Sequence, residues 1–327
     1  MTWTRLIRFV AKEDGKTYYG DCITKGDIGL LYFENKLIQA HPLNLSVNEN
    51  LNRSASSLLP LSPFNDSSDF KIDPSKTLTV LKLLPPLDPT SITTIRGLGL
   101  QYAPPGSSNV SHPPPPVPCL FLKPPSTLSG PNQEIVIPSI AKGEKNDYEV
   151  ELCVIIGSRD LPKNTNEKDV MKYVGGFTVV NDVSSRGLCG KGGAGQWGMG
   201  KNYDSWCPIG PCIVKPSSLS NPHSLDFNTK LNNKLVQKGN TSQLLLSVPK
   251  LLATLCQGST LSAHSLILTG SPIAIGRNLP TDSNEQSPFL KNGDLVKCWI
   301  QGIGTLVNTV REENESETTS QIYKAKL

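Results

Sequence analysis

The chain has 327 residues, of which 37% are hydrophobic and 18% charged, a composition typical of a globular protein rather than a disordered one. Its 32 basic and 28 acidic residues leave a net charge of +4, which is too weak and dispersed to indicate nucleic-acid binding. No apolar run approaches the roughly 18 residues of a membrane span, and residues 1–10 lack an apolar core of signal-peptide length. The eight cysteines form no Cys-x-x-Cys pair, so we expect reduced thiols in an intracellular protein.

Residues 1–85 are predicted to form a small β-rich domain. Short strand-like runs at 4–10, 17–23 and 29–33 are separated by turn residues. A loop rich in serine, aspartate and proline follows at 54–75, and the Leu-Pro-Pro-Leu sequence at 84–87 is interpreted as a hinge. We therefore expect a second domain over residues 86–311 and a flexible polar tail over 312–327.

The second domain opens with a predicted strand at 92–98. The next segment, 101–118, is rich in proline, glycine and serine and is not expected to form regular structure. A loop of this length inside a compact domain is commonly functional, so we predict a lid over about residues 97–118.

Further strands are predicted at 118–123, 134–137, 265–269 and 295–300. Two short helices are predicted, at 166–174 and at 247–257. In the second, Ser247 is the expected N-cap, and the buried stripe comprises Leu251, Leu252 and Leu255. The fold class that follows is mixed and β-dominated, with few short helices.

Two carboxylates lie in a run, 147–157, that otherwise has the pattern of a buried strand. Glu149 and Glu151 are two residues apart and therefore share a face of the strand. Like charges on a core strand are costly unless a cation compensates them. A third carboxylate, Asp182, ends a second apolar run at 176–182. Three oxygen ligands favour Mg²⁺, with Mn²⁺ or Ca²⁺ next. The alternative is a solvated edge strand, against which the following apolar run argues.

Residues 195–202 nearly match a nucleotide-binding P-loop, but Asn202 stands where serine or threonine is required. Nucleotide binding is therefore not expected. Residues 190–195 are more consistent with a flexible loop near Asp182. Lys201 either neutralises a substrate carboxylate or is an ordinary surface lysine.

Other catalytic groups are scarce. The chain contains no Gly-x-Ser-x-Gly motif, which disfavours a serine hydrolase. Its only histidines are His41, His112, His223 and His264. We expect each to lie at the surface, with His112 in the proline-rich loop.

Ordered blocks of residues between about 95 and 310 resemble the fumarylacetoacetate hydrolase superfamily, in the branch of fumarylpyruvate hydrolases, acylpyruvases and oxaloacetate decarboxylase-tautomerases. These blocks are Phe-Leu-Lys-Pro at 121–124, Asp-Tyr-Glu-Val-Glu-Leu at 147–152, Asn-Asp-Val-Ser-Ser-Arg at 181–186, Gln-Trp at 196–197, Gly-Lys at 200–201, Cys-Pro-Ile-Gly-Pro at 207–211 and Leu-Thr-Gly-Ser-Pro at 268–272.

The resemblance implies a compact mixed β-roll, a homodimer and a dicarbonyl acid substrate. It also implies a Mg²⁺ or Mn²⁺ site at Glu149, Glu151 and Asp182, in agreement with the charge argument. The residues it assigns to substrate binding are Lys123, Tyr102, Gln196 and Ser271. The predicted catalytic residues are Lys201, Arg186 and His112.

The departures from the family pattern concern the lid. Relatives carry Gly-Leu-Asn-Tyr-x-x-His-x-x-Glu, whose histidine and glutamate activate water, whereas residues 97–108 of this chain contain neither. Gly187 also replaces the usual aspartate, and Cys189 a common polar residue. The default expectation is metal-dependent hydrolysis of a carbon–carbon bond through an enolate, with His112 as a substitute base. Decarboxylation, keto–enol tautomerisation and a ligand-binding member without activity are the alternatives.

The last three residues, Ala325-Lys326-Leu327, differ by one small residue from the Ser-Lys-Leu peroxisomal signal. The preceding polar segment would leave them accessible to an import receptor. We therefore expect a peroxisomal protein, with an ordinary cytoplasmic tail as the alternative.

Overall fold

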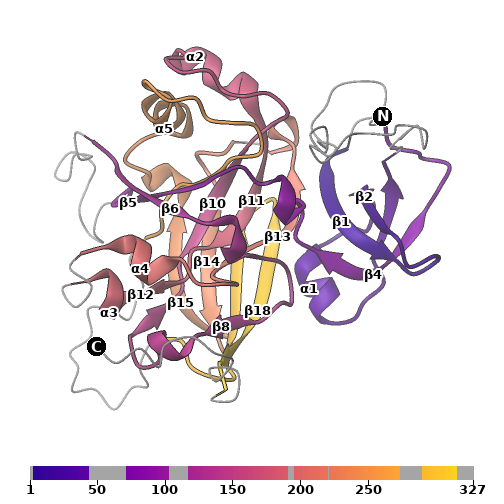
Figure 1. The fold of residues 1–327 in the computed structure, drawn as a ribbon. Helices are drawn as coiled ribbons and strands as arrows, with labels where there is room; N and C mark the ends of the chain where they lie inside the picture. The colour runs from indigo at the N-terminus through magenta and orange to yellow at the C-terminus, as the bar shows by residue number, and fades with distance from the viewer. Residues whose placement is uncertain are drawn as a thin grey trace, which may run out of the picture.

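The computed structural model describes residues 3–43, 71–102, 117–190, 195–219, 221–272 and 289–314. Strands dominate this part of the chain and helices are few and short, as predicted (Figure 1). The strands form an 11-stranded sheet, a five-stranded sheet and a two-stranded ribbon. The described residues include the predicted strands of the second domain and, of the predicted 54–75 loop, only residues 71–75.

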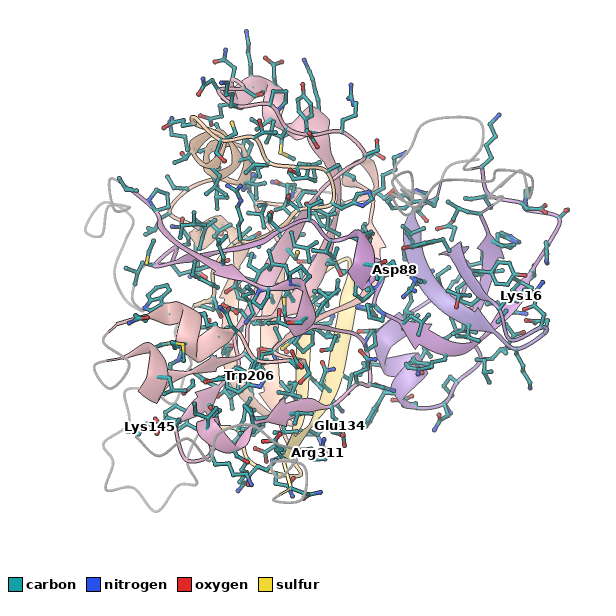
Figure 2. The ribbon with its side chains drawn as sticks, viewed as in Figure 1. Lys16, Asp88, Glu134, Lys145, Trp206 and Arg311 are labelled. Carbon is teal, nitrogen blue, oxygen red and sulfur yellow. The ribbon has the colours of Figure 1, made fainter. Side chains whose placement is uncertain are left out.

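The N-terminal part contributes the first strands of the large sheet, which are β1 (Arg5–Ala11), β2 (Thr17–Cys22), β3 (Gln39–Pro42) and β4 (Leu78–Leu84). β1 also pairs with β13 (Cys207–Val214), where Arg5 is opposite Val214 and Leu6 is opposite Ile213. One sheet therefore runs through both predicted domains. A 2.6 Å ion pair between Arg8 and Asp88 adds a contact at their junction, where Asp88 is labelled in Figure 2.

The prediction of a strand at 29–33 was wrong, because this segment forms the helix α1 (Ile28–Phe33). The Asp27 carboxylate accepts hydrogen bonds from the backbone N–H groups of Gly29 and Leu30, an N-cap that starts the helix. In so short an apolar run the hydrophobic pattern alone does not distinguish a helix from a strand. Asp27 also accepts from the backbone and hydroxyl of Thr305, so the same side chain fixes α1 on the C-terminal strand beside it.

The centre of the large sheet is buried on both faces. Every residue of β10 (Val150–Ile156) and of β13 is buried. This explains why both segments read as continuous apolar runs instead of alternating ones. The remaining strands of this sheet, from the centre to its edge, are β11 (Val174–Asn181), β16 (Leu266–Leu268), β5 (Ile95–Gly99) and β6 (Cys119–Lys123), with β7 (Leu128–Ser129) beside β13.

The five-stranded sheet packs against β10 and β11, and its inner residues, such as Phe227 and Ile300, share a core with Val154 and Phe177. In Figure 1 the yellow β18 and the pale β14 lie next to β10 and β11. Its strands are β14 (Asp226–Leu231), β15 (Lys234–Asn240), β17 (Leu295–Ile300), β18 (Gly304–Glu312) and β8 (Ile135–Ile137).

The predicted helix at 247–257 is confirmed as α5 (Val248–Leu255). Ser247 is its N-cap, and Leu251, Leu252 and Leu255 are buried as predicted. The helix predicted at 166–174 is α2 (Glu167–Val170) continued by a 3₁₀ turn (Met171–Tyr173), and it packs on α5 (Figure 1). The other short 3₁₀ turns are Pro89–Ser91, Pro125–Thr127, Ser139–Ala141, Pro216–Ser218 and Thr241–Gln243.

Several predictions concern residues outside the described part of the chain. They include residues 103–116 of the lid, with His112, most of the 54–75 loop, and Ala325-Lys326-Leu327. All eight cysteines are unpaired, and six of them, Cys153 and Cys298 included, are buried. Among the described residues no helix is long and apolar enough to cross a membrane.

We expect Asp27→Ala to lower the free energy of unfolding by about 2 kcal/mol, because it removes a helix cap and leaves the N–H groups of Gly29 and Thr305 without their acceptor. Urea denaturation measures the change. Asp73→Ala is the matched control, since the Asp73 side chain accepts from Ser75 in a local turn, and we expect it to cost no more than about 0.5 kcal/mol. Equal effects of the two substitutions would contradict the role assigned to Asp27.

Candidate active site

Three acidic side chains meet where the antiparallel strands β10 and β11 end together. Val150 is opposite Asn181 in this pair, and the Asp182 N–H donates to the Glu149 carbonyl over 2.8 Å. This register brings one oxygen each of Glu149, Glu151 and Asp182 within 4.8 Å of one another. Glu151 and Asp182 are buried, and Glu149 is half-buried and lies just before the strand, which starts at Val150.

Lys201, the last residue of α4 (Trp197–Lys201), points into this cluster. Its Nζ donates to Glu149 Oε2 over 2.9 Å and to Ser184 Oγ over 2.6 Å, and it forms an ion pair with Asp182. The lysine is only 3% exposed, which rules out the surface-lysine alternative. Most of the 195–202 segment that nearly matches a P-loop is therefore the helix α4, which places the Lys201 ammonium in the acidic cluster.

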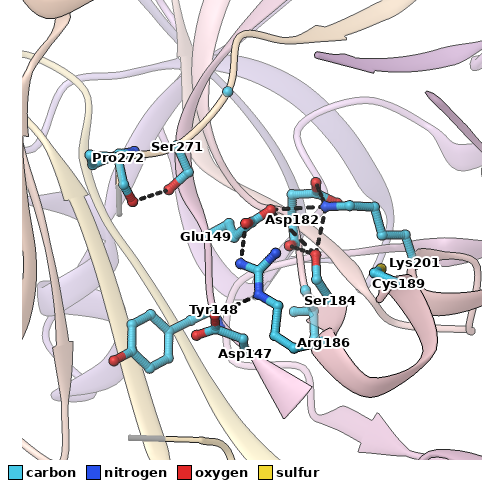
Figure 3. A network of polar contacts seen from close by, with 12 residues as sticks. Asp147, Tyr148, Glu149, Asp182, Ser184, Arg186, Cys189, Lys201, Ser271 and Pro272 are labelled. Carbon is cyan, nitrogen blue, oxygen red and sulfur yellow. Dashed lines mark hydrogen bonds and ion pairs between the residues drawn. The ribbon is translucent and has the colours of Figure 1, made fainter. Parts of the chain in front are cut away.

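Two more cations bind the same acidic groups, as Figure 3 shows in part. Lys123 Nζ donates to Asp182 Oδ1 over 2.7 Å and to the Val183 carbonyl over 3.3 Å. Arg186 opens α3 (Arg186–Cys189), pairs with Asp147 over 2.8 Å, and also forms an ion pair with Glu149. Asp147 belongs to β9 (Asn146–Asp147), which pairs with β12 (Ser184–Ser185) and so holds the arginine beside the cluster.

Burial and the neighbouring charges shift the pKa values of Glu149 and Lys201 in opposite directions. Burial opposes ionisation of Glu149, but the charges of Arg186 and Lys201 outweigh it and hold the pKa of Glu149 below its usual value. Burial likewise disfavours the ammonium of Lys201, but Asp182 and Glu149 outweigh it and raise the pKa of Lys201. Lys201 is therefore a fixed cation at neutral pH, which can stabilise negative charge but is not a base.

Glu151 has a different environment. Among the described residues it forms no ion pair, and its carboxylate accepts a 2.6 Å hydrogen bond from the Gly270 N–H. Burial, and then the negative charges of Asp182 and Glu149, raise the pKa of Glu151 well above its usual value. Counting Asp147, four carboxyl groups face three cations among the described residues, which leaves one excess negative charge when Glu151 is ionised. A converging set of carboxylate oxygens with excess negative charge fits a divalent cation.

An aromatic pair covers Lys201. Its Nζ lies 4.4 Å from the centroid of the Phe121 ring and 6.0 Å from that of Trp197, and the two rings meet edge to face. A Cβ atom on Gly97 would overlap the Phe121 ring, and one on Gly99 would overlap Trp197. The two glycines of β5 thus make room for an aromatic wall that our sequence analysis did not identify, although their spacing of two along a strand was a usable signal.

The remaining predicted residues differ in their environment. Ser271 is half-buried and accepts a 2.9 Å hydrogen bond from Gln237 Nε2. Tyr102 is buried, its ring packs edge to face on Phe227, and its hydroxyl has no hydrogen-bond partner among the described residues. Burial, and then the charge of Glu151, raise the pKa of Tyr102. Gln196 is exposed and precedes α4 without capping it by its side chain.

The described histidines bond elsewhere. The ring of His41 contacts the Lys76 carbonyl, and the backbone of His223 bonds Asn221. The expectation of a surface position was wrong for His264, which is buried and whose backbone N–H donates to the Ile156 carbonyl over 3.0 Å. His112 lies outside the described residues, so its assignment as a base stays a prediction. Asp147, Ser184 and Gln237 are polar members of the site that our sequence analysis missed.

The chain matches a known family model and is similar in sequence to characterised proteins. Residues 97–311 match the family model described as the C-terminal domain of fumarylacetoacetate hydrolase. A caffeoylpyruvate hydrolase of Neonothopanus nambi is 36% identical over 320 residues, which cover 95% of this chain and 94% of that protein. A mitochondrial oxaloacetate tautomerase of Homo sapiens is 38% identical over 200 residues, which cover 61% of this chain and 60% of that protein.

Solved structures with a similar fold include one named as a fumarylacetoacetate hydrolase and one named as an isomerase. A fumarylacetoacetate hydrolase from Exiguobacterium antarcticum superimposes with a TM-score of 0.72 at 25% identity, covering 95% of this chain and all of that one. A 5-carboxymethyl-2-hydroxymuconate delta-isomerase from Mycobacterium smegmatis gives a TM-score of 0.69 at 25% identity, covering 94% of this chain and all of that one.

We expect Glu151→Gln to stabilise the metal-free protein above pH 5. A carboxyl group whose pKa is raised by folding makes stability fall as pH rises from the usual value of 4.5 towards the folded-state pKa. Urea denaturation in EDTA should therefore show wild-type protein losing stability across this window. The variant should lack that component and be more stable by about 1 kcal/mol or more at pH 8.

Glu134→Gln is the control for this comparison, since Glu134 is an exposed partner of Arg311. It should follow the pH dependence of wild-type protein. If the Glu151→Gln variant kept the pH dependence of wild-type protein, the group responsible for that dependence would not be Glu151.

Proposed function

Because the chain belongs to the fumarylacetoacetate hydrolase family, we propose that it is a divalent-metal-dependent enzyme that hydrolyses a carbon–carbon bond of an acylpyruvate. The observation that carries the proposal is the cluster of Glu149, Glu151 and Asp182 together with Lys201. Glu149, Glu151 and Asp182 would hold Mg²⁺ or Mn²⁺, which when bound supplies Lewis acidity to a dicarbonyl and favours its enolate.

The residues of the chain stabilise the negative charge that develops on such a substrate. Lys201 is fixed as an ammonium by its carboxylate partners, and Arg186 is held by Asp147 at the rim of the cluster. Both charges are set before substrate arrives, so little reorganisation opposes the reaction. Lys123 neutralises Asp182 from the buried side and keeps that carboxylate in place.

The aromatic wall formed by Phe121 and Trp197 favours an acylpyruvate substrate whose acyl group is aromatic. Trp197 is half-buried, and two residues close to it or to Gly99 in the sequence, Met199 and Leu100, expose 53% and 66% of their surface. A planar ring could pack against Trp197 and these apolar side chains while the pyruvate end faces Lys201. The alignment with the caffeoylpyruvate hydrolase, which extends over 95% of the chain, points to the same substrate class.

The second candidate is keto–enol tautomerisation of an oxaloacetate-like acid. It is favoured by the absence of histidine and glutamate from residues 97–108, the segment that resembles the water-activating block of relatives. Lys201 cannot replace that base because its carboxylate partners keep it protonated. Tautomerisation needs an enolate and a proton transfer but no attacking water, so it depends less on the missing pair.

The test is to incubate the full chain with Mg²⁺ or Mn²⁺ and either benzoylpyruvate, caffeoylpyruvate or oxaloacetate. Hydrolysis of either acylpyruvate consumes one water and releases pyruvate together with benzoic acid or caffeic acid, which chromatography separates. We expect Asp182→Asn to reduce this activity at least about 100-fold, because it removes one proposed metal ligand and a partner of both lysines. Asp204→Asn, at an exposed position, is the control and should retain activity.

The products decide between the candidates. Interconversion of keto and enol oxaloacetate without pyruvate release would support the tautomerase. Metal binding without any turnover of the panel would indicate a member that only binds its ligand.

We expect Lys201→Met to lower kcat at least about 100-fold at saturating Mg²⁺, because it removes the cation fixed nearest the proposed enolate. Lys201→Arg keeps a positive charge and should retain more activity than Lys201→Met. Lys142→Met, at an exposed lysine, controls for the loss of one charge. Wild-type kcat in Lys201→Met would contradict the catalytic role.

A further inference from the structure

Gln237, on β15, is fully buried beside the acidic cluster, and every hydrogen-bonding capacity of its amide is used. Its Oε1 accepts from the Val150 N–H over 3.1 Å and from the Thr229 hydroxyl over 2.9 Å. Its Nε2 donates to Ser271 Oγ and to the Pro272 carbonyl, each over 2.9 Å. An amide has two lone pairs on oxygen and two hydrogens on nitrogen, so none of its groups is left over.

These partners allow only one orientation of the amide. The Val150 N–H can only donate, and the Pro272 carbonyl can only accept. A flipped amide would set two donors against each other at Val150 and two acceptors against each other at Pro272. The backbone therefore decides that Nε2 faces Ser271.

The orientation of Gln237 fixes the role of the Ser271 hydroxyl. Because Ser271 Oγ accepts from Gln237, its own hydrogen has to be donated elsewhere. The acceptor that the described residues offer is the neighbouring Pro272 carbonyl at 3.5 Å, at the outer limit of a hydrogen bond. The hydroxyl hydrogen is thus available to a ligand.

Ser271 lies beside the acidic cluster, so a ligand that accepts its hydrogen would be bound in the candidate active site. Its neighbour Gly270 donates to Glu151 over 2.6 Å, and Val150 lies between Glu149 and Glu151. Gln237 therefore ties the start of β10, between two proposed metal ligands, to the turn that carries Ser271. In Figure 3 Ser271 lies to one side of Glu149, and Asp182 and Lys201 lie to the other.

We propose that Gln237 is a positioning residue that presets Ser271 as a hydrogen-bond donor, so that the site selects a ligand with an accepting oxygen, a carboxylate or carbonyl, at this position. The identity of that ligand as a dicarbonyl acid rests on the proposed function. The direction of the hydrogen bond rests only on the contacts of Gln237.

The experiment measures binding of oxalate, a non-reacting dicarboxylate, to the full chain in saturating Mg²⁺ by calorimetry, together with KM and kcat for benzoylpyruvate. We expect Ser271→Ala to weaken oxalate binding about 10-fold, equivalent to about 1.4 kcal/mol. Gln237→Met, which keeps the size but not the hydrogen bonds, should weaken it similarly and raise KM more than it lowers kcat. The double variant should be no weaker than either single one, because both changes remove the same interaction.

Thr178→Val is the matched control. Thr178 is fully buried in the same core and its hydroxyl bonds the Cys212 carbonyl over 2.8 Å, away from the acidic cluster. We expect it to lower thermal stability as Gln237→Met does, but to leave oxalate affinity unchanged.

Additive losses in the double variant, or unchanged oxalate affinity in Ser271→Ala or Gln237→Met, would overturn the inference while leaving the proposed function intact. Absence of oxalate binding to the unaltered chain would instead overturn the proposed function, and with it the ligand that this inference assigns to Ser271.

Discussion

The structure depends on four carboxylates that are held together at one end of β10 and β11. Ordinary cores avoid such a concentration of like charge, because the desolvation of each group and their mutual repulsion oppose folding. Lys123, Lys201 and Arg186 offset most of it, and each comes from a different element. Within the described part of the chain, Glu151 has no ion-pair partner and accepts one hydrogen bond, from the Gly270 N–H. The cluster is therefore incomplete as a structural ion-pair network, and this incompleteness is what makes it suited to a cation or a charged substrate.

The apolar parts of the fold hold this cluster in place. β10 and β13 are buried along their whole length, so a one-residue slip of the β10–β11 register would change the placement of Glu151 and Asp182 at once. The N-terminal part adds to this rigidity, since β1 extends the same sheet through β13 and Asp27 binds the C-terminal strand. The small N-terminal unit is thus joined to the frame of the site by backbone pairing.

The sequence was informative where side-chain chemistry repeats a short-range pattern. Glu149 and Glu151 were grouped by their spacing and Asp182 was added as the end of a second apolar run, and the structure brings the three together through the antiparallel pairing of β10 and β11. Ser247 and the leucines of α5 followed from capping and helical periodicity. The helix α1 did not, because its six residues are too few to show a period and its cap is completed by Thr305, far away in the sequence. The contact of Trp197 with Gly99 and the hydrogen bond between Gln237 and Ser271 were also missed, because contacts between distant segments leave no local pattern in the sequence.

The described part of the site is better supplied with positive charge and hydrogen-bond donors than with bases. Lys201 is kept protonated by Glu149 and Asp182, Ser271 is preset to donate, and burial raises the pKa of Tyr102 so that its phenol also stays protonated. Under the proposed function, such donors would stabilise an enolate, which hydrolysis and tautomerisation share. The reactions diverge only when water must be activated, and in relatives that step belongs to the lid block in which this chain departs from the family. If the proposed function holds, the choice between the two activities would depend on the lid sequence after Tyr102, while the frame of β10 and β11 and its charges would serve either one.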